Sequence, residues 1–251
     1  MSLTAIILTH NEALNIADCI RSVQFADEIL VLDDSSTDGT TDIAINEGAR
    51  VIHRSMNNNW GEQRNYALTQ ASCDFIFFLD ADERVTPQLA KEIQHQLLLH
   101  SDRCFALRRE NHFSTGPVTH GILRSDRVNR IFPKGKGHYE GQVHEKLICQ
   151  LPTSTLKGKL IHYPYRDWSH YWQKFDKYTA ISAKKYLDNG RSCSFWKDIF
   201  LRPLWAFIKV YFINLGFLDG KLGWIFSINH YCYTMNKYVR LYSLKHNGGR
   251  I

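Results

Sequence analysis

Short apolar runs alternate with segments of helical periodicity over the first hundred residues. The runs lie at 3–8, 29–32, 51–52 and 75–79. Each is short enough for a buried strand, and the segments between them place apolar residues three and four positions apart, as helices do. Thr86 and Pro87 predict the cap and first position of a later helix, and Asn11 is available to cap the first. Alternating strands and helices predict an α/β fold with a mostly parallel sheet and helices on both faces.

The pattern changes twice further along the chain. From 101 to 164 the spacing shortens and Gly and Pro become frequent, which predicts strands and loops that complete a domain over 1–164. Beyond residue 165 the pattern becomes helical and rich in aromatic residues. The sequence therefore predicts a C-terminal amphipathic, aromatic-rich helical region over 165–251.

Polar side chains follow three of the predicted strands. They are Thr9, His10 and Glu12 after the first strand, Asp33 and Asp34 after the second, and Asp80 and Asp82 after the fourth. In open α/β sheets, ligands bind beyond the carboxyl ends of the strands. The three clusters therefore predict one ligand site at that edge of the sheet.

Asp80 and Asp82 form the sharpest motif, because two carboxylates end a fully apolar run. Mg²⁺ or Mn²⁺, held by one or two carboxylates and completed by substrate phosphates, would compensate their charge. For an isolated pair, an acidic turn that caps a helix is the alternative. Asp33 could bond a nucleobase and ribose or serve ordinary turn chemistry, and Arg64 could bind phosphate or lie on a solvated helix face.

Four motifs in this order resemble the family 2 glycosyltransferases of GT-A (Rossmann-like) fold, which are inverting enzymes that use nucleotide sugars. The motifs are "LTHNE", "LDDSSTDGT", "GEQRNYAL" and "FFLDADE". The resemblance implies that 1–100 binds the nucleotide sugar and that 101–164 faces the acceptor. It implies metal binding by Asp82 with Asp80 nearby, and donor contacts from Thr9, His10, Glu12, Asp33 or Asp34. His10 stands where many members have tyrosine, so the resemblance does not carry an aromatic contact to it.

Two later stretches, "RIFPKGKGHYEGQVHEKL" and "HYPYRDWSHYWQKFDKY", resemble the lipopolysaccharide inner-core β-1,4-glucosyltransferases. That resemblance implies transfer of glucose from UDP-glucose to a heptose of the lipid A core saccharide, at the cytoplasmic face of a bacterial inner membrane. The alternatives are another sugar such as galactose, or another lipid-linked acceptor. A non-catalytic protein that binds nucleotide sugars or membrane surfaces, and a phosphatase with Asp80 as nucleophile, are alternatives of other classes.

An inverting transfer needs a carboxylate that deprotonates the acceptor hydroxyl. Glu145 and Glu140 are the candidates, and each could instead be a surface glutamate on a strand. We favour Glu145, because the pair His144-Glu145 falls where family members place an acidic catalytic pair.

Three further residues could contact the donor. His162 follows an apolar run and could be a third metal ligand, or a core or turn histidine whose ring nitrogens are hydrogen-bonded within the protein. Lys174 and Tyr178 are one helical turn apart and could touch the donor phosphates, although a helical lysine commonly faces water.

The net charge of +6 is concentrated in the aromatic C-terminal region. Residues 195–251 contain eight Lys or Arg but only two acids, Asp198 and Asp219, and charged residues interrupt every apolar stretch before it reaches the length of a membrane span. This composition predicts a helical region on an anionic membrane surface, an amphipathic helical pair packed on the catalytic domain or on a second subunit of a homodimer, or both. No nucleic-acid module is predicted. The six scattered cysteines and the apolar start predict a cytoplasmic protein without a signal peptide.

Overall fold

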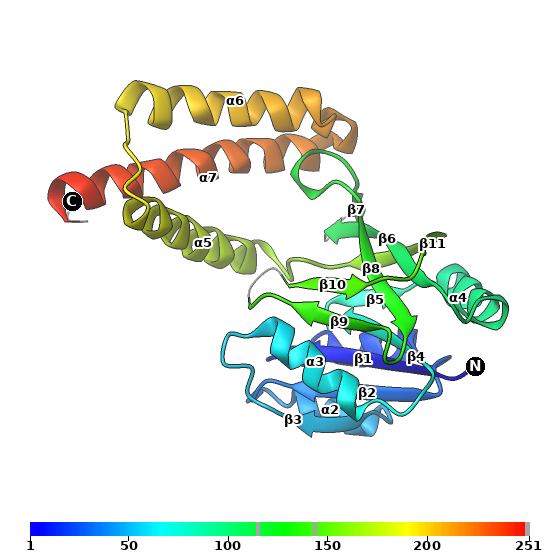
Figure 1. Ribbon diagram of the computed structural model, residues 1–251. Coiled ribbons are helices and arrows are strands. Elements are labelled where there is room, and N and C mark those ends of the chain that lie inside the picture. The colour runs from blue at the N-terminus through cyan, green and yellow to red at the C-terminus, as the bar shows by residue number, and fades with distance from the viewer. Residues whose placement is uncertain (114–115, 143–144, 249–251) are drawn as a thin grey trace. The chain divides into compact units, whose positions relative to one another are not determined.

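The computed structural model describes residues 1–113, 116–142 and 145–248 (Figure 1). Strands and helices alternate over the first hundred residues, as predicted. The strands are β1 (Leu3–Thr9), β2 (Glu28–Asp33), β3 (Arg50–His53), β4 (Phe75–Asp80), β5 (Glu83–Val85), β6 (Cys104–Phe113), β7 (Gly116–Val118), β8 (Asp126–Pro133), β9 (Gly137–Glu140), β10 (Lys146–Cys149) and β11 (Thr153–His162). The α-helices are α1 (Ile16–Ser22), α2 (Thr40–Asn46), α3 (Trp60–Gln70), α4 (Pro87–Leu99), α5 (Trp168–Asp188), α6 (Arg202–Ile208) and α7 (Gly220–Asn247).

The main sheet has the strand order β3-β2-β1-β4-β8-β6-β11-β5, and β7 pairs with β6. The neighbours β3, β2, β1 and β4 are parallel, whereas β8 joins β4 in the antiparallel direction. The parallel half is built by the strand-helix alternation, because each return to a parallel strand needs a crossover. The predicted α/β class is confirmed, and β9 with β10 forms a separate ribbon.

Helices cover both faces of the parallel half. One buried cluster joins side chains of α1, α2 and α4 to one face of the sheet, and a second joins α3 to the other. Strand β4 contributes Phe77 to the first cluster and Phe78 to the second, because neighbouring residues of a strand point to opposite faces. This explains why β4 is apolar at every position before Asp80.

The two predicted helix caps have different outcomes. Thr86 caps α4 as expected, since its hydroxyl accepts a hydrogen bond from the backbone N–H of Leu89. The prediction that Asn11 caps α1 is wrong. Asn11 has a left-handed φ of 53°, which asparagine tolerates, and its side-chain oxygen accepts from the backbone N–H of Thr37. Asn11 therefore ties together the loops after β1 and β2.

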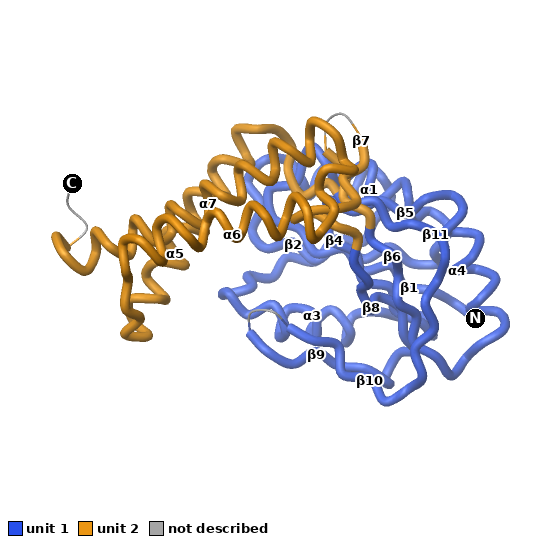
Figure 2. Tube along the Cα trace, turned by 90° about the horizontal axis from the view of Figure 1, so that it is seen from above, with its two compact units in different colours: residues 1–109, 126–162 blue, residues 110–125, 163–251 orange. Residues whose placement is uncertain are grey.

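The chain divides into two compact units (Figure 2). Unit 1 consists of residues 1–109 and 126–162 and contains the parallel half of the sheet. Unit 2 consists of residues 110–125 together with the chain from 163 onward.

Unit 2 is built around aromatic side chains. Phe113 and Phe226 of its core have ring centroids 5.3 Å apart, and Trp168 of α5 packs on both. Helix α7 packs against α5 and against α6, and π-helical segments η2 (Phe195–Leu201) and η3 (Lys209–Ile213) flank α6. Among the described residues, no single helix is long and apolar enough to cross a membrane. Residues 195–213 and 216–247 meet that test only together, as a pair bent by 70°.

Candidate functional site

The carboxyl ends of β1, β2 and β4 lie side by side in unit 1. Thr9 is in register with Asp33, and Leu8 is in register with Asp80. The polar residues that follow these strands therefore share one edge of the sheet. The backbone N–H of Asp34 donates to the carbonyl of Thr9, which joins the first two clusters directly.

The residues after β2 are held by the loops around them. Asp33 is fully buried, and its Oδ2 accepts from the backbone N–H of Ser36 and lies 3.3 Å from Nδ1 of His53. Asp34 accepts from the backbone N–H of Met56. His10, an exposed residue, has Nδ1 2.5 Å from the Asp34 carbonyl. The predicted nucleotide contacts Asp33, Asp34 and His10 thus belong to one connected group.

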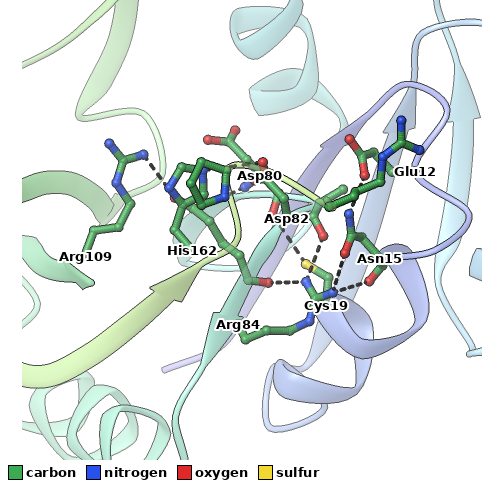
Figure 3. A network of polar contacts seen from close by, with 12 residues as sticks. Glu12, Asn15, Cys19, Asp80, Asp82, Arg84, Arg109 and His162 are labelled. Atoms are coloured by element: carbon green, nitrogen blue, oxygen red, sulfur yellow. Dashed lines mark hydrogen bonds and ion pairs between the residues drawn. The ribbon is translucent and has the colours of Figure 1, made fainter. Parts of the chain in front are cut away.

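Glu12 lies in the loop that leads into α1. Its Oε2 accepts a hydrogen bond from the side chain of Asn15, 2.6 Å away, and its backbone N–H donates to Thr40. These bonds fix the loop between β1 and α1 (Figure 3).

Arg64, from α3, connects carboxylates that are far apart in the sequence. Its Nη2 donates to Asp80 at 3.1 Å, and its Nε donates to Glu145 at 2.8 Å. The guanidinium is buried beside the rings of Phe78 and Tyr139, whose centroids lie 5.2 and 5.3 Å from its central carbon. Of the two interpretations of Arg64, the structure excludes a solvated helix face.

Asp80 is surrounded by positive charge. Arg130 of β8 donates to its Oδ2 at 2.7 Å, while Arg64 occupies its Oδ1. Desolvation by burial tends to raise the pKa of the Asp80 carboxyl, but Arg130 and Arg64 outweigh it and hold that pKa well below its usual range. Asp80 is therefore ionised, and both of its oxygens are engaged by protein.

Asp82 differs from Asp80 in that its oxygens are not engaged by arginine side chains. Its Oδ2 lies 3.4 Å from Nε2 of His162, at the end of β11, and its Oδ1 is buried without a hydrogen-bond partner (Figure 3). The structure thus brings two of the three predicted metal ligands together. Within the described ranges, no group of three or more His, Cys, Asp or Glu forms a complete metal site.

Four buried polar atoms in the described part of unit 1 belong to predicted site residues and have no hydrogen-bond partner. They are Oγ1 of Thr9, Oδ1 of Asp33, Oδ1 of Asp82 and Nη1 of Arg64. Leaving a buried polar group unsatisfied costs about 1–3 kcal/mol, so such groups call for an explanation. Their position at one sheet edge fits a polar ligand that supplies both donors and acceptors.

The two candidate bases occupy different surroundings. Glu145 is 16% exposed and bonded to Arg64, so it belongs to the same network as Asp80. Glu140, on β9, is 66% exposed and pairs with His138. His144 lies outside the described residues.

Lys174 and Tyr178 lie on α5 in unit 2. The Lys174 ammonium donates to the carbonyl of Pro164 at 2.9 Å and lies over the ring of Tyr165. Tyr178 is half exposed. Their predicted contact with phosphate stays a prediction.

Sequence reasoning missed the residues that position Asp80. Arg130 donates from one Nη2 to both Asp80 and Glu83, and Arg109 of β6 lies 3.4 Å from Glu83. Glu83 is fully buried, and its Oε2 accepts from the backbone N–H of Asp80. The pKa of Glu83 is raised, chiefly by desolvation, although Arg130 opposes the shift. Glu83 and Arg130 stand inside two of the motifs named above, but only the pairing of β4 with β8 shows their role.

Comparison with known proteins adds an independent finding. Residues 4–150 match the family model described as glycosyl transferase family 2. The chain is 29% identical to the lipopolysaccharide core biosynthesis glycosyltransferase LpsC of Rhizobium meliloti, over 96% of this chain and 92% of that protein. It is 25% identical to an uncharacterized glycosyltransferase of Rickettsia prowazekii, over 97% and 86% of the two chains. The crystal structure of TarS residues 1–349 from S. aureus shares the fold, with a TM-score of 0.50, 16% identity, and coverage of 99% and 92%.

Proposed function

Because the chain belongs to glycosyl transferase family 2, we propose that it transfers a hexose, glucose from UDP-glucose, to a heptose of the lipopolysaccharide inner core. The similarity to LpsC along almost the whole of both chains supports an acceptor in the lipopolysaccharide core. The donor and the heptose follow from the resemblance of the two later motifs to the inner-core β-1,4-glucosyltransferases.

The proposed donor site rests on one observation, the buried polar atoms at the sheet edge that have no hydrogen-bond partner. Thr9 and Asp33 would bond the uridine, since a buried hydroxyl and carboxylate can hydrogen-bond a base and ribose. Nη1 of Arg64 would donate to the diphosphate, which matches a guanidinium in charge and geometry. A nucleotide sugar would therefore complete hydrogen bonds that the protein leaves open.

Asp82 and His162 are the residues that fit a divalent cation. The buried Oδ1 of Asp82 lacks a partner, and His162 lies beside Oδ2. Mg²⁺ and Mn²⁺ commonly take only one or two protein carboxylates and complete their shell with phosphate oxygens and water. When bound, such a cation would neutralise charge that develops on the departing diphosphate. Asp80 would act differently, because its oxygens already bond Arg64 and Arg130.

Glu145 is the proposed base. The acceptor oxygen would attack C1 of the sugar while the bond from C1 to the diphosphate oxygen breaks, and the hydroxyl proton would pass to a Glu145 oxygen. Arg64 donates to Oε1 of Glu145 and so orients its carboxylate. Glu140 faces solvent beside His138, which supports the preference for Glu145.

We place the reaction at the cytoplasmic face of the inner membrane, because the proposed acceptor is anchored in lipid. The excess of positive charge in 195–251 would favour an anionic bilayer. A homodimer contact through the C-terminal region is the other possibility that the composition leaves open.

The direct test mixes the purified protein with UDP-[14C]glucose, Mg²⁺ and heptose-terminated lipid A core. We expect label in the lipid and release of UDP. Labelling from UDP-galactose instead would identify galactose, and not glucose, as the transferred sugar. Metal-dependent UDP binding without transfer from any nucleotide sugar would contradict the enzymatic assignment and support a binding protein.

A further inference from the structure

Helical residues of unit 2 between 195 and 228 present apolar side chains to solvent. Half of the exposed large hydrophobic side chains among the described residues lie in this stretch, and we call them the outer face. Trp196, Phe200 and Leu204 follow one another at intervals of four and are 71%, 51% and 42% exposed. A surface helix of a soluble protein normally turns its polar side outward. Residues 195–228 instead expose fourteen large apolar side chains, a concentration that is typical of an interaction surface.

Residues 212–218 end η3 and continue into the turn before α7, and we call this segment the tip. Five side chains at the tip are each between 43% and 58% exposed, and they are Phe212, Ile213, Leu215, Phe217 and Leu218. Turns at a protein surface are usually made of Gly, Pro, Asn, Asp and Ser. The tip contains Asn214 and Gly216, which are of this kind, but it also exposes five large apolar side chains that a turn does not need.

The backbone is constrained at two positions, in the tip and where α7 packs against it. Leu215 has a left-handed φ of 58°, which a leucine adopts with strain and an asparagine or glycine adopts easily. A Cβ at Gly223 would lie only 1.7 Å from the carbonyl oxygen of Gly216, so α7 approaches the turn through glycine. The tip is thus a packed element that keeps an apolar side chain at a strained position.

In the stretch 195–228 that carries the outer face, the lysine side chains are exposed and the two acidic side chains are buried. Its two acids point inward: the Asp198 carboxylate bonds Arg202 and is 7% exposed, and that of Asp219 accepts from the backbone N–H of His120 and is 5% exposed. Lys197, Lys209 and Lys221 are exposed. Lys209 precedes the tip by three residues, and Lys221 follows it by three.

We propose that the outer face docks on an anionic lipid bilayer and that the tip enters one leaflet. The tip side chains would replace water by acyl chains, while Lys209 and Lys221 would reach lipid phosphates, as long basic side chains do at membrane interfaces. Tryptophan, which the outer face contains, favours the same headgroup region. A helix pair bent by 70° fits insertion into one leaflet better than a straight span.

A second copy of the chain fits this surface less well. In a twofold dimer the same patch faces itself, so the exposed lysines would oppose lysines. The two acids of the outer face are both buried and cannot compensate them. Anionic lipid supplies the charge that a second copy lacks.

The test is co-sedimentation of the full chain with vesicles of phosphatidylcholine, with and without phosphatidylglycerol. We expect binding to the anionic vesicles that weakens in high salt, and quenching of tryptophan fluorescence by brominated lipid in the unsubstituted protein. The double variant Ile213→Ser/Leu218→Ser should reduce the partition coefficient about tenfold or more, because it removes two apolar side chains that binding would bury in lipid. The matched control Leu98→Ser/Leu99→Ser changes residues of α4 in unit 1 that are at least as exposed, and it should bind normally.

Charge is tested separately with Lys209→Gln/Lys221→Gln, against Lys91→Gln/Lys136→Gln as the control. We expect the first pair alone to lose most of the preference for phosphatidylglycerol. The proposal is overturned by absence of vesicle binding, by equal losses in variant and control, or by a lipid-free dimer that Ile213→Ser/Leu218→Ser dissociates. The proposal deepens the membrane location given above, and because the assay contains no nucleotide sugar, its failure is distinguishable from failure of the proposed transferase reaction.

Discussion

The guanidinium of Arg64 donates to two carboxylates that the proposed reaction uses for different purposes. Asp80 belongs to the donor side and Glu145 to the acceptor side, yet a single buried side chain sets the position of both. Gly61, in the same helix, lies against the backbone of Gly141, so that a Cβ there would be 2.3 Å from a carbonyl oxygen. Helix α3 is therefore packed closely on the segment that leads to Glu145.

At the residue scale, Asp82→Asn should remove the metal-dependent part of UDP binding. The amide lacks the negative charge that a hard cation selects. Titration calorimetry with UDP, with and without Mn²⁺, should show affinity reduced by about tenfold or more only when the metal is present. Asp18→Asn, an exposed change on α1, is the control. Equal metal-dependent affinity in both variants would show that Asp82 does not hold the cation.

Glu145→Gln should leave UDP binding intact and reduce kcat by about 10² to 10⁴-fold, the usual contribution of a general base. The amide oxygen can still accept from Arg64, so the network should persist. Glu140→Gln is the matched control on the neighbouring ribbon. If Glu140→Gln loses turnover and Glu145→Gln retains it, the base is Glu140.

Arg130→Met should destabilise unit 1 by about 3–5 kcal/mol, because it leaves the buried carboxylate of Glu83 without its closest cation. Arg127→Met, an exposed change on the same strand, should alter the free energy of unfolding by less than about 0.5 kcal/mol. Urea unfolding measures both. Adding Glu83→Gln to Arg130→Met should restore part of the loss, and an unchanged double variant would argue against this pairing.

At the scale of elements, the sequence predicts what depends on local pattern. Strand β4 and helix α3 are predictable because an apolar run covered on both faces and a helical repeat leave clear signatures. The link from Arg130 to Asp80 spans fifty positions and depends on the pairing of β4 with β8. No local pattern encodes that register.

Glu28 shows how one side chain joins several elements. Its carboxylate, at the start of β2, accepts hydrogen bonds from Thr4 of β1, Arg50 of β3 and Ser72 after α3. Desolvation raises the pKa of Glu28, but these hydrogen bonds outweigh it and lower that pKa from 4.5 to about 2. Because the folded pKa is the lower one, the ionised carboxylate stabilises the fold above pH 4.5, and this contribution is lost as the pH falls towards 2.

Glu28→Gln should therefore cost about 1–2 kcal/mol at neutral pH, a value reduced for the partial exposure of the site. The difference from the unsubstituted chain should shrink progressively below pH 4.5. Thermal unfolding at a series of pH values measures it. Asp188→Asn, at the exposed end of α5, should show no such trend, and a constant penalty for Glu28→Gln at every pH would contradict the assigned pKa.

At the scale of the whole molecule, amino-acid composition and long-range contacts divide the chain into different parts. The charge and aromatic content of 195–251 are enough to predict a second kind of region. The compact units also show that residues 110–125 pack with the chain after 163, which follows from long-range contacts and not from composition. The inward orientation of Asp198 and Asp219, on which the outer face depends, is likewise visible only in the folded unit.

The membrane proposal and the transferase proposal together predict a dependence on how the acceptor is presented. Binding to a bilayer confines the enzyme to the surface that holds a lipid-linked acceptor, which raises the effective concentration without any new contact to the sugar. Ile213→Ser/Leu218→Ser should therefore raise the apparent KM about tenfold for heptose-terminated lipid A core in anionic vesicles, and leave the apparent KM for a short soluble core saccharide unchanged. UDP affinity should also stay the same, since Thr9, Asp33 and Arg64 lie in unit 1. Equal effects on both acceptors would mean that the tip serves the fold of unit 2, because a purely structural defect does not distinguish a soluble saccharide from one anchored in lipid.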